Sequence, residues 1–503
     1  MRVWIIFLFY IFFMQNVYAK KTLSVLLNTS EGNPYSADAP SSAKTLLESA
    51  VVGRLIQVES NIVYPKLLKE AYYDYKSDEY ILVLKSDLYF HNKRKVTIED
   101  LEFSLLKHYF SPEKSHGIGA LDSILGVEDI KKNNITQFKS GLVKGVKIIS
   151  STSLKIKLKA LDPNFLYMIS DPSFSLVPIE ELDSAYKNWK TVPIGAGNYA
   201  VEEAFNDGKV KLKKVNSNLK NAVDEVFLYT KYAKNNNYDI YLVKSPDVDI
   251  KKYSVYSSRQ PISQFGLIFT NVNELGNNLN FRKFVQAALD SEKFVKYADG
   301  FSSINEVLPN SKWGLSNLDS NYSPNLAEKY LAKVPKELLK KKWNVTVYSA
   351  GNSVRSYKKD FMEEIKKQLG VYGFQMDYIP VTSQFLPKHL AENTPFDVSS
   401  IQIDPYDVLF KFSRLTKNGE DEFVKPLFDP KLEELYSSVL VEGNFEEKYR
   451  KINELNKYVH EMAYWVPLLQ RKNIIYYNSK VIEQLTNAGD EVTIINLENI
   501  ILK

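Results

Sequence analysis

Mainly apolar stretches and alternating stretches predict β-strands in the first half of the chain. Residues 22–27 and 80–84 are mainly apolar and have the length of a buried strand. Residues 145–149 and 153–158 alternate apolar with polar side chains on either side of Ser150-Ser151-Thr152, which predicts a β-hairpin with one solvated face. Further strands are predicted at residues 199–205, 210–214 and 239–243.

The pattern changes in the second half, where apolar residues recur at helical spacing. Helices are predicted at residues 281–289, 357–369 and 449–459. Strands predicted at residues 343–348 and 374–378 flank the second of these helices, and a strand, helix and strand in succession form a βαβ unit with a parallel sheet. Another helix is predicted to begin at Thr97, because Thr97 and Asp100 have the spacing of a capping box. The whole pattern predicts an α/β protein with at least two lobes.

Length and composition are those of a globular protein with roughly two to four domains. Of the 503 residues, 44% are hydrophobic and 25% are charged, which argues against disorder. The 65 basic and 60 acidic residues nearly balance, and the longest basic runs are short, so no nucleic-acid partner is expected. The absence of cysteine excludes disulfides, thiolate metal sites, a cysteine nucleophile and a lipid-modified N-terminal cysteine.

The first residues have the layout of a secretory signal peptide. Arg2 supplies a positive charge, residues 3–14 are almost entirely apolar, and Val17-Tyr18-Ala19 offers small side chains at the two positions that a signal peptidase reads. Cleavage is expected after Ala19, giving an exported protein. The alternative is a membrane anchor, but the apolar stretch is shorter than the ~20 residues needed to span a bilayer.

Few patterns indicate catalysis or a metal site. No two of the five histidines have the spacing that places two ligands on one helix face, so neither a metal nor a cofactor is expected. No nucleophile elbow, Walker loop or zinc-protease motif is present, and an enzyme is therefore not expected. Residues 195–200 match the dinucleotide pattern G-x-G-x-x-A. That match is rejected, because residues 201–205 predict a strand where the fingerprint needs a helix.

Five segments, in this order, resemble the motifs of one known family. They are Tyr80–His91, ending in a phenylalanine–histidine pair; Val96–Ser104, similar to the helix start T-A-E-D-V-x-x-S; Pro193–Tyr199, similar to P-x-G-T-G-P-Y; Phe281–Asp290, similar to V-R-Q-A-L-x-x-A-I-D; and Glu461–Leu468, similar to A-P-W-I-P-L. The family is that of the bacterial extracellular solute-binding proteins of ABC transporters, of the dipeptide, oligopeptide and nickel type (family 5).

The resemblance implies a two-lobed periplasmic-binding-protein clamp, type II-like, with an extra subdomain. The implied boundaries are 20–52, 184–268 and 472–503 for lobe I, 53–183 for the extra subdomain and 269–471 for lobe II. The chain would cross between the lobes near residues 269–271 and again within 467–474. The implied protein is a periplasmic monomer that captures oligopeptides or similar solutes and delivers them to an ABC permease in the inner membrane. A cleft with flat apolar walls would also account for the 33 tyrosines and 27 phenylalanines.

The resemblance also implies ligand-binding residues on both lobes. They are Thr29, Ser30, Glu31, Asn271, Ser399, Ser400, Gln402, Asp404, Tyr406 and Asp407. Peptide-binding members have a tryptophan and an aspartate just before a D-P pair, and that aspartate binds the amino terminus of the peptide. Here residues 399–403, before the pair Asp404-Pro405, contain neither. Unless Asp404 or Asp407 replaces the aspartate, the ligand is something other than a free-amine peptide, because a buried ammonium without a carboxylate costs several kcal/mol.

Other interpretations stay open. Asp404 and Asp407 are also suited to capping a turn and a short helix at residues 408–412. The same fold could bind nickel or a metal chelate, or act as a sensor or scaffold without a transport role. An exported enzyme is the remaining alternative.

Overall fold

The computed structural model describes most of the chain after its first twenty residues. The described residues are 21–27, 42–59, 62–110, 121–204, 208–230, 237–242, 249–258, 261, 263–269, 273–297, 299–308, 315–348, 356–381, 394–402, 412, 415–416, 429–485 and 495–503. The predicted signal peptide, residues 1–19, lies outside them.

The first sheet has seven strands in the order β12-β19-β11-β1-β10-β9-β8. Its central strand β1 (Thr22–Leu26) is parallel to β10 (Glu225–Tyr229) and β11 (Ile240–Tyr241). The other strands are β8 (Tyr199–Ala204), β9 (Lys209–Lys214), β12 (Ser254–Ser257) and β19 (Ile474–Tyr477). The strands predicted in residues 22–27, 199–205, 210–214 and 239–243 are therefore confirmed, whereas β10 and β12 were not predicted.

The second sheet has six strands in the order β14-β18-β13-β17-β15-β16. They are β13 (Ser263–Phe269), β14 (Phe301–Ser303), β15 (Trp343–Tyr348), β16 (Met376–Val381), β17 (Phe396–Gln402) and β18 (Trp465–Arg471). β15 and β16 are parallel and α11 (Ser356–Gly370) connects them, so the predicted βαβ unit is confirmed.

Helices cover both faces of the second sheet. Phe265, Leu267 and Phe269 of β13 pack into a cluster with α8 (Leu279–Ala288) and α11, whereas Ile268, on the opposite face, packs with α14 (Pro430–Leu440) and α15 (Phe445–Glu461). Shorter helices in this part are α7 (Glu274–Asn277), α9 (Pro324–Leu331), α10 (Lys336–Leu339) and the 3-10 helix at Ser291–Tyr297. The predicted helices at residues 281–289 and 449–459 correspond to α8 and α15.

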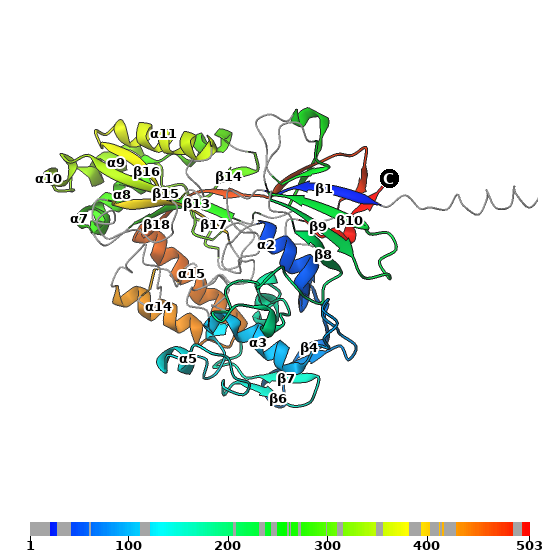
Figure 1. Cartoon of the computed structure of the whole chain (residues 1–503). Coiled ribbons are helices and arrows are strands. Elements are labelled where there is room, and N and C mark those ends of the chain that lie inside the picture. The colour runs from blue at the N-terminus through cyan, green and yellow to red at the C-terminus, as the bar shows by residue number, and fades with distance from the viewer. Residues whose placement is uncertain are drawn as a thin grey trace, which may run out of the picture.

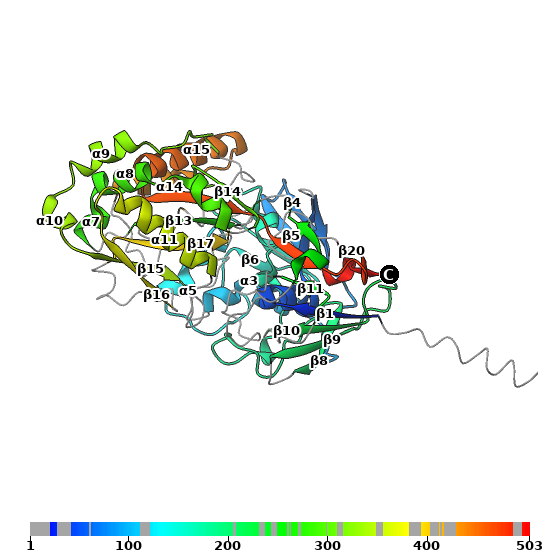
Figure 2. The same cartoon turned by 90° about the horizontal axis from the view of Figure 1, so that it is seen from above.

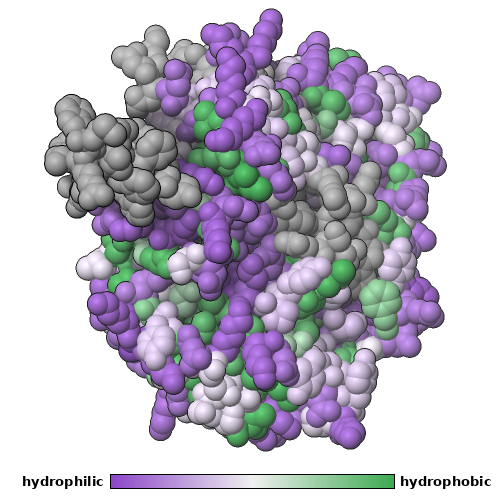
Figure 3. Space-filling model, turned by 90° about the vertical axis from the view of Figure 1, so that its right-hand side faces the viewer, coloured by the Kyte–Doolittle hydropathy of each residue, from purple (hydrophilic) through white to green (hydrophobic). Residues whose placement is uncertain are grey.

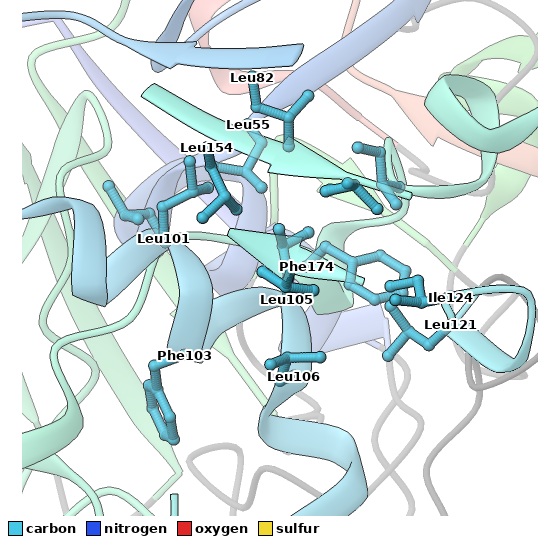
Figure 4. Close-up of a cluster of buried hydrophobic side chains, with 14 of the residues drawn as sticks. Leu55, Leu82, Leu101, Phe103, Leu105, Leu106, Leu121, Ile124, Leu154 and Phe174 are labelled. Atoms are coloured by element: carbon cyan, nitrogen blue, oxygen red, sulfur yellow. The ribbon is translucent and has the colours of Figure 1, made fainter. Parts of the chain in front are cut away.

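The third sheet is antiparallel, in the order β4-β5-β7-β6. Its strands are β4 (Leu68–Asp74), β5 (Glu79–Leu84), β6 (Val146–Ile148) and β7 (Ser153–Ile156), and α3 (Ile98–Phe110) packs against it. Figure 4 shows Leu101 of α3 beside Leu154 of β7, and Leu105 beside Phe174. The predicted hairpin is confirmed by β6 and β7, and the predicted helix start by the Thr97 N–H, which donates to Asp100 Oδ2 over 2.8 Å.

Short elements connect the three sheets. They are α2 (Ser42–Leu47), the π-helix η1 (Glu48–Gly53), the hairpin of β2 (Ile56–Glu59) and β3 (Ile62–Pro65), α5 (Glu128–Lys132), α6 (Phe165–Met168), the 3-10 helices at Pro172–Phe174, Ile179–Glu181, Ile250–Lys252 and Leu497–Asn499, and the pair β20 (Ile482–Gln484) and β21 (Ile501–Leu502).

The chain crosses twice between the first and second sheets, which lie side by side in Figures 1 and 2. The first crossing follows β12 and the second follows β18, which leads directly into β19. The second crossing lies within the predicted residues 467–474. The first comes before β13, not near residues 269–271 as predicted, because β13 pairs along its length with β17 and β18 of the second sheet. An apolar strand in a sequence does not show which sheet it will join.

Residues 195–198 form a glycine-containing bend directly before β8, called the glycine turn below. The Ala196 and Gly197 N–H groups donate to the carbonyls of Val52 and Val51 in η1 over 2.8 and 2.9 Å. β8 follows directly, so the rejection of the dinucleotide fingerprint is confirmed.

Candidate functional site

The strand directions turn the C-terminal ends of β1 and β17 toward the two chain crossings. In the second sheet, Ser263 is in register with both Gln402 and Arg471. The C-terminal end of β17 therefore lies at the same end of the strands as both crossings. In the first sheet, β19 runs away from the second crossing, and β11 runs antiparallel to β19 and parallel to β1. The C-terminal end of β1 therefore also points toward the crossings. Ligand sites of α/β proteins form at such carboxyl ends.

The predicted site residues stand as follows relative to this arrangement. Ser399, Ser400 and Gln402 lie in β17, where their backbones pair with Gly266, Phe265 and Ser263 of β13. The others lie outside the residues that the structure describes, namely Thr29, Ser30 and Glu31, which follow β1 in sequence, Asn271, which follows β13, and Asp404, Tyr406 and Asp407, which follow β17. Their role in binding stays a prediction.

A hydrogen bond beside the second crossing joins the two sheets. Tyr476 of β19 donates its hydroxyl to Asp299 Oδ2, just before β14, over 2.9 Å. Burial and the bond to Asp299 raise the pKa of Tyr476 to about 12, so the hydroxyl keeps its proton. Tyr476 belongs to a buried cluster with Leu26, Tyr238 and Tyr241 on one face of the first sheet. Sequence reasoning missed this pair, since nothing in the spacing of residues 299 and 476 links them.

Hydrogen bonds connect the histidine of the phenylalanine–histidine pair to the glycine turn at residues 195–198. The His91 N–H donates to the Gly195 carbonyl over 2.8 Å, and Nε2 lies 2.9 Å from the Gly197 carbonyl, which can only accept, so Nε2 carries the proton. The other ring nitrogen, Nδ1, is buried without a hydrogen-bond partner. Two motifs separated by about a hundred residues thus form one structural unit, which lies apart from the crossings.

The burial of His91 predicts a loss of stability in mild acid. Burial lowers the pKa of His91 below its ordinary value, despite the bond to Gly197, and burial likewise lowers the pKa of His460. The unfolded chain therefore binds more protons once the pH falls below about 6.5, and the free energy of unfolding decreases from there until the pH passes the lower folded pKa. Thermal melts between pH 7.5 and pH 5 should show this decrease. A His91→Gln variant should show a smaller one, and an unchanged pH dependence would contradict the assignment.

A cavity with a mixed polar and apolar lining lies between the first sheet and the third. It has a volume of about 440 Å³ and is lined by η1, the β2–β3 hairpin, the glycine turn and residues 495–498. Glu498 accepts from Lys66 over 3.1 Å and also from Asn198, so its carboxylate ties the C-terminal segment to β3 and to the turn. The face of the molecule in Figure 3 is mainly hydrophilic. Of the predicted ligand-binding residues that the structure describes, Ser399, Ser400 and Gln402, none lines the cavity.

The described part of the chain has neither a candidate metal site nor a candidate membrane span. Within it, no group of three or more histidine, aspartate or glutamate side chains is placed to hold a metal ion. None of its helices is long and apolar enough to cross a membrane.

Comparison with known proteins agrees with this geometry. The family described as bacterial extracellular solute-binding proteins, family 5 (middle part), matches residues 63–423, which is more than half of the chain. No curated protein matches the chain in sequence.

Several solved structures share the fold. Oligopeptide-binding OppAIV from Borrelia burgdorferi is 16% identical with a TM-score of 0.80, covering 96% of this chain and 100% of that one. OppA from Haemophilus influenzae, in complex with RPPGFSPFR, is 13% identical with a TM-score of 0.77, covering 96% and 99%. NikZ from Campylobacter jejuni, in complex with Ni(L-His), is 17% identical with a TM-score of 0.71, covering 93% and 95%. The predicted two-lobed fold and the predicted family are both confirmed.

Proposed function

Since the chain belongs to the bacterial extracellular solute-binding proteins of family 5, we propose that it is the substrate-binding component of an ABC transporter. It captures oligopeptides or similar solutes between two lobes and delivers them to an inner-membrane permease. The observation that supports a ligand site between the lobes is the strand register, which turns the C-terminal ends of β1 and β17 toward the same crossing edge.

In this proposal lobe I is built on the first sheet, lobe II on the second sheet, and the extra subdomain on the third. The proposed start of lobe II is the segment between β12 and β13; the pairing of β13 with β17 and β18 supports this boundary. The protein is exported, cleaved after Ala19, and works in the periplasm as a monomer. Ligand contacts from both lobes favour the closed clamp, as in other hinged binding proteins.

Native mass spectrometry of protein purified from the periplasm without denaturation tests the proposal. We expect co-purifying peptides or another organic solute, released when the protein is unfolded. Bound nickel or a nickel chelate would instead support the alternative cargo. Protein that carries no ligand and binds none from a peptide pool or a nickel–histidine solution would contradict a transport role.

Calorimetry with the co-purified ligand, together with thermal melting, tests the proposed site residues. Asp404→Asn and Asp407→Asn should each weaken binding of the co-purified ligand by about 2–5 kcal/mol if the carboxylate pairs with a ligand cation. If the two residues instead only cap a turn and a helix, the variants should lose about 1 kcal/mol of stability and bind as the parent does.

A further inference from the structure

A buried ion pair joins α15 of lobe II to the extra subdomain. Lys448 Nζ lies 2.9 Å from Asp162 Oδ2, and only 4% of the Lys448 side chain and 12% of the Asp162 side chain are exposed. The backbone segments beside the ion pair are also close to each other, since Gly443, just before α15, lies next to Leu161, just before Asp162. Most other ion pairs of the described chain are far more exposed, such as Arg450 and Glu447 on the same helix.

The extra subdomain holds Asp162 in a fixed position. The Asp162 carbonyl accepts from the Tyr80 hydroxyl over 2.6 Å and from the Phe165 N–H over 3.0 Å. Its other carboxylate oxygen, Oδ1, accepts from the Asn164 N–H over 3.0 Å. The ring of Tyr80 packs against Phe165, with centroids 4.9 Å apart. The extra subdomain therefore holds the Asp162 carboxylate in position by contacts that do not involve Lys448.

No chain crossing ties α15 to the extra subdomain. The chain enters this subdomain from η1 and leaves it toward β8, and both Val51 of η1 and Tyr199 of β8 pack in the core of lobe I. Both crossings instead join lobe II to β12 and β19 of the first sheet. The contact at Lys448 is therefore non-covalent and can separate when the lobes move.

Separation would change the energy of the pair through hydration. In the joined arrangement both charges have lost most of their water, and each depends on the other for compensation. After separation both charges regain water. If only one charge is removed, the other is buried and unpaired in the joined arrangement but hydrated in the separated one. The joined arrangement alone is destabilised, so the equilibrium shifts toward the separated, open arrangement. Removing both charges leaves no unpaired charge in either arrangement.

We propose that Lys448 and Asp162 form a latch that holds lobe II against the extra subdomain and favours the closed clamp. This inference rests on the proposed function in one respect, that the lobes open and close. It gives the extra subdomain a part in closure, beyond its attachment to lobe I.

The absence of cysteine in the chain permits a direct test without any ligand. Tyr75→Cys in the extra subdomain and Val371→Cys in lobe II, which are 86% and 79% exposed in the parent, provide sites for two spin labels. Pulsed electron resonance then gives the distribution of distances between the two bodies. We expect Lys448→Met and Asp162→Asn each to raise the ratio of open to closed molecules at least tenfold.

Two further variants decide the interpretation. The double variant, with Lys448→Met and Asp162→Asn combined, should be more open than the parent, because it lacks the pair, but less open than the single variants, because it has no unpaired buried charge. Arg450→Gln, which removes an exposed charge from the same helix, should leave the distribution unchanged.

The latch is wrong if both single variants fold, by circular dichroism and melting, and give the parent distribution. It is equally wrong if the double variant gives the parent distribution, because the pair then contributes nothing to closure. Should one single variant fail to fold, the other still decides. Because the measurement uses ligand-free protein, its outcome is independent of the mass-spectrometric test of transport, and either proposal can fail alone.

Discussion

Gly195→Ala should destabilise the protein severely, by about 3 kcal/mol or more, or prevent its folding. A Cβ at Gly195 would overlap the Cα and the carbonyl of Val52 in η1. Because the obstacle is backbone held by the Val51 and Val52 hydrogen bonds to the turn, no side-chain rotation relieves it. Chemical denaturation, or the yield of soluble protein, measures the effect.

Gly370→Ala is the matched control for this substitution. Gly370 is the last residue of α11, and nothing lies within 4 Å of a Cβ placed there. Alanine is the better helix former, so this variant should be neutral or slightly more stable than the parent. If Gly195→Ala behaved in the same way, the close packing between the glycine turn and η1 would be contradicted.

Glu306→Ala should cost about 3 kcal/mol of stability and loosen lobe II. The Glu306 side chain accepts from the N–H groups of Ser316 and Leu318, each over 2.8 Å, and from Asn456 Nδ2 over 2.6 Å. Glu306 is 4% exposed and Asn456 of α15 is fully buried, so water cannot readily replace the lost acceptor.

The matched comparison for Glu306 uses two further variants. Glu306→Gln keeps one acceptor oxygen and should lose less stability than the alanine variant. Glu328→Ala, on the exposed side of α9, should change stability by less than about 0.5 kcal/mol. Equal denaturation midpoints for all three variants would mean that the Glu306 carboxylate does not hold the loop at residues 315–318.

The clamp also shows why some local features were predictable and others were not. Hydrophobic periodicity depends only on near neighbours in the chain, so it predicted the β6–β7 hairpin, the β15–α11–β16 unit and α15. The strand after the glycine turn also followed from local pattern. The resemblance of five ordered segments predicted the family and the two-lobed fold.

Tertiary structure alone decided how these parts meet. The strand β13 was not predicted, and its pairing with β17 and β18 joins it to the second sheet, whereas the boundary implied by the resemblance assigned residues up to 268 to lobe I. The contacts of Tyr476 with Asp299, of Lys448 with Asp162 and of His91 with the glycine turn join residues far apart in the chain. The sequence by itself determined many of the helices and strands and, through the resemblance, the family, whereas the candidate residues around Asp404 stay a prediction. Strand register and the pairing of buried polar groups depend on contacts between distant segments, and no local pattern encodes those contacts.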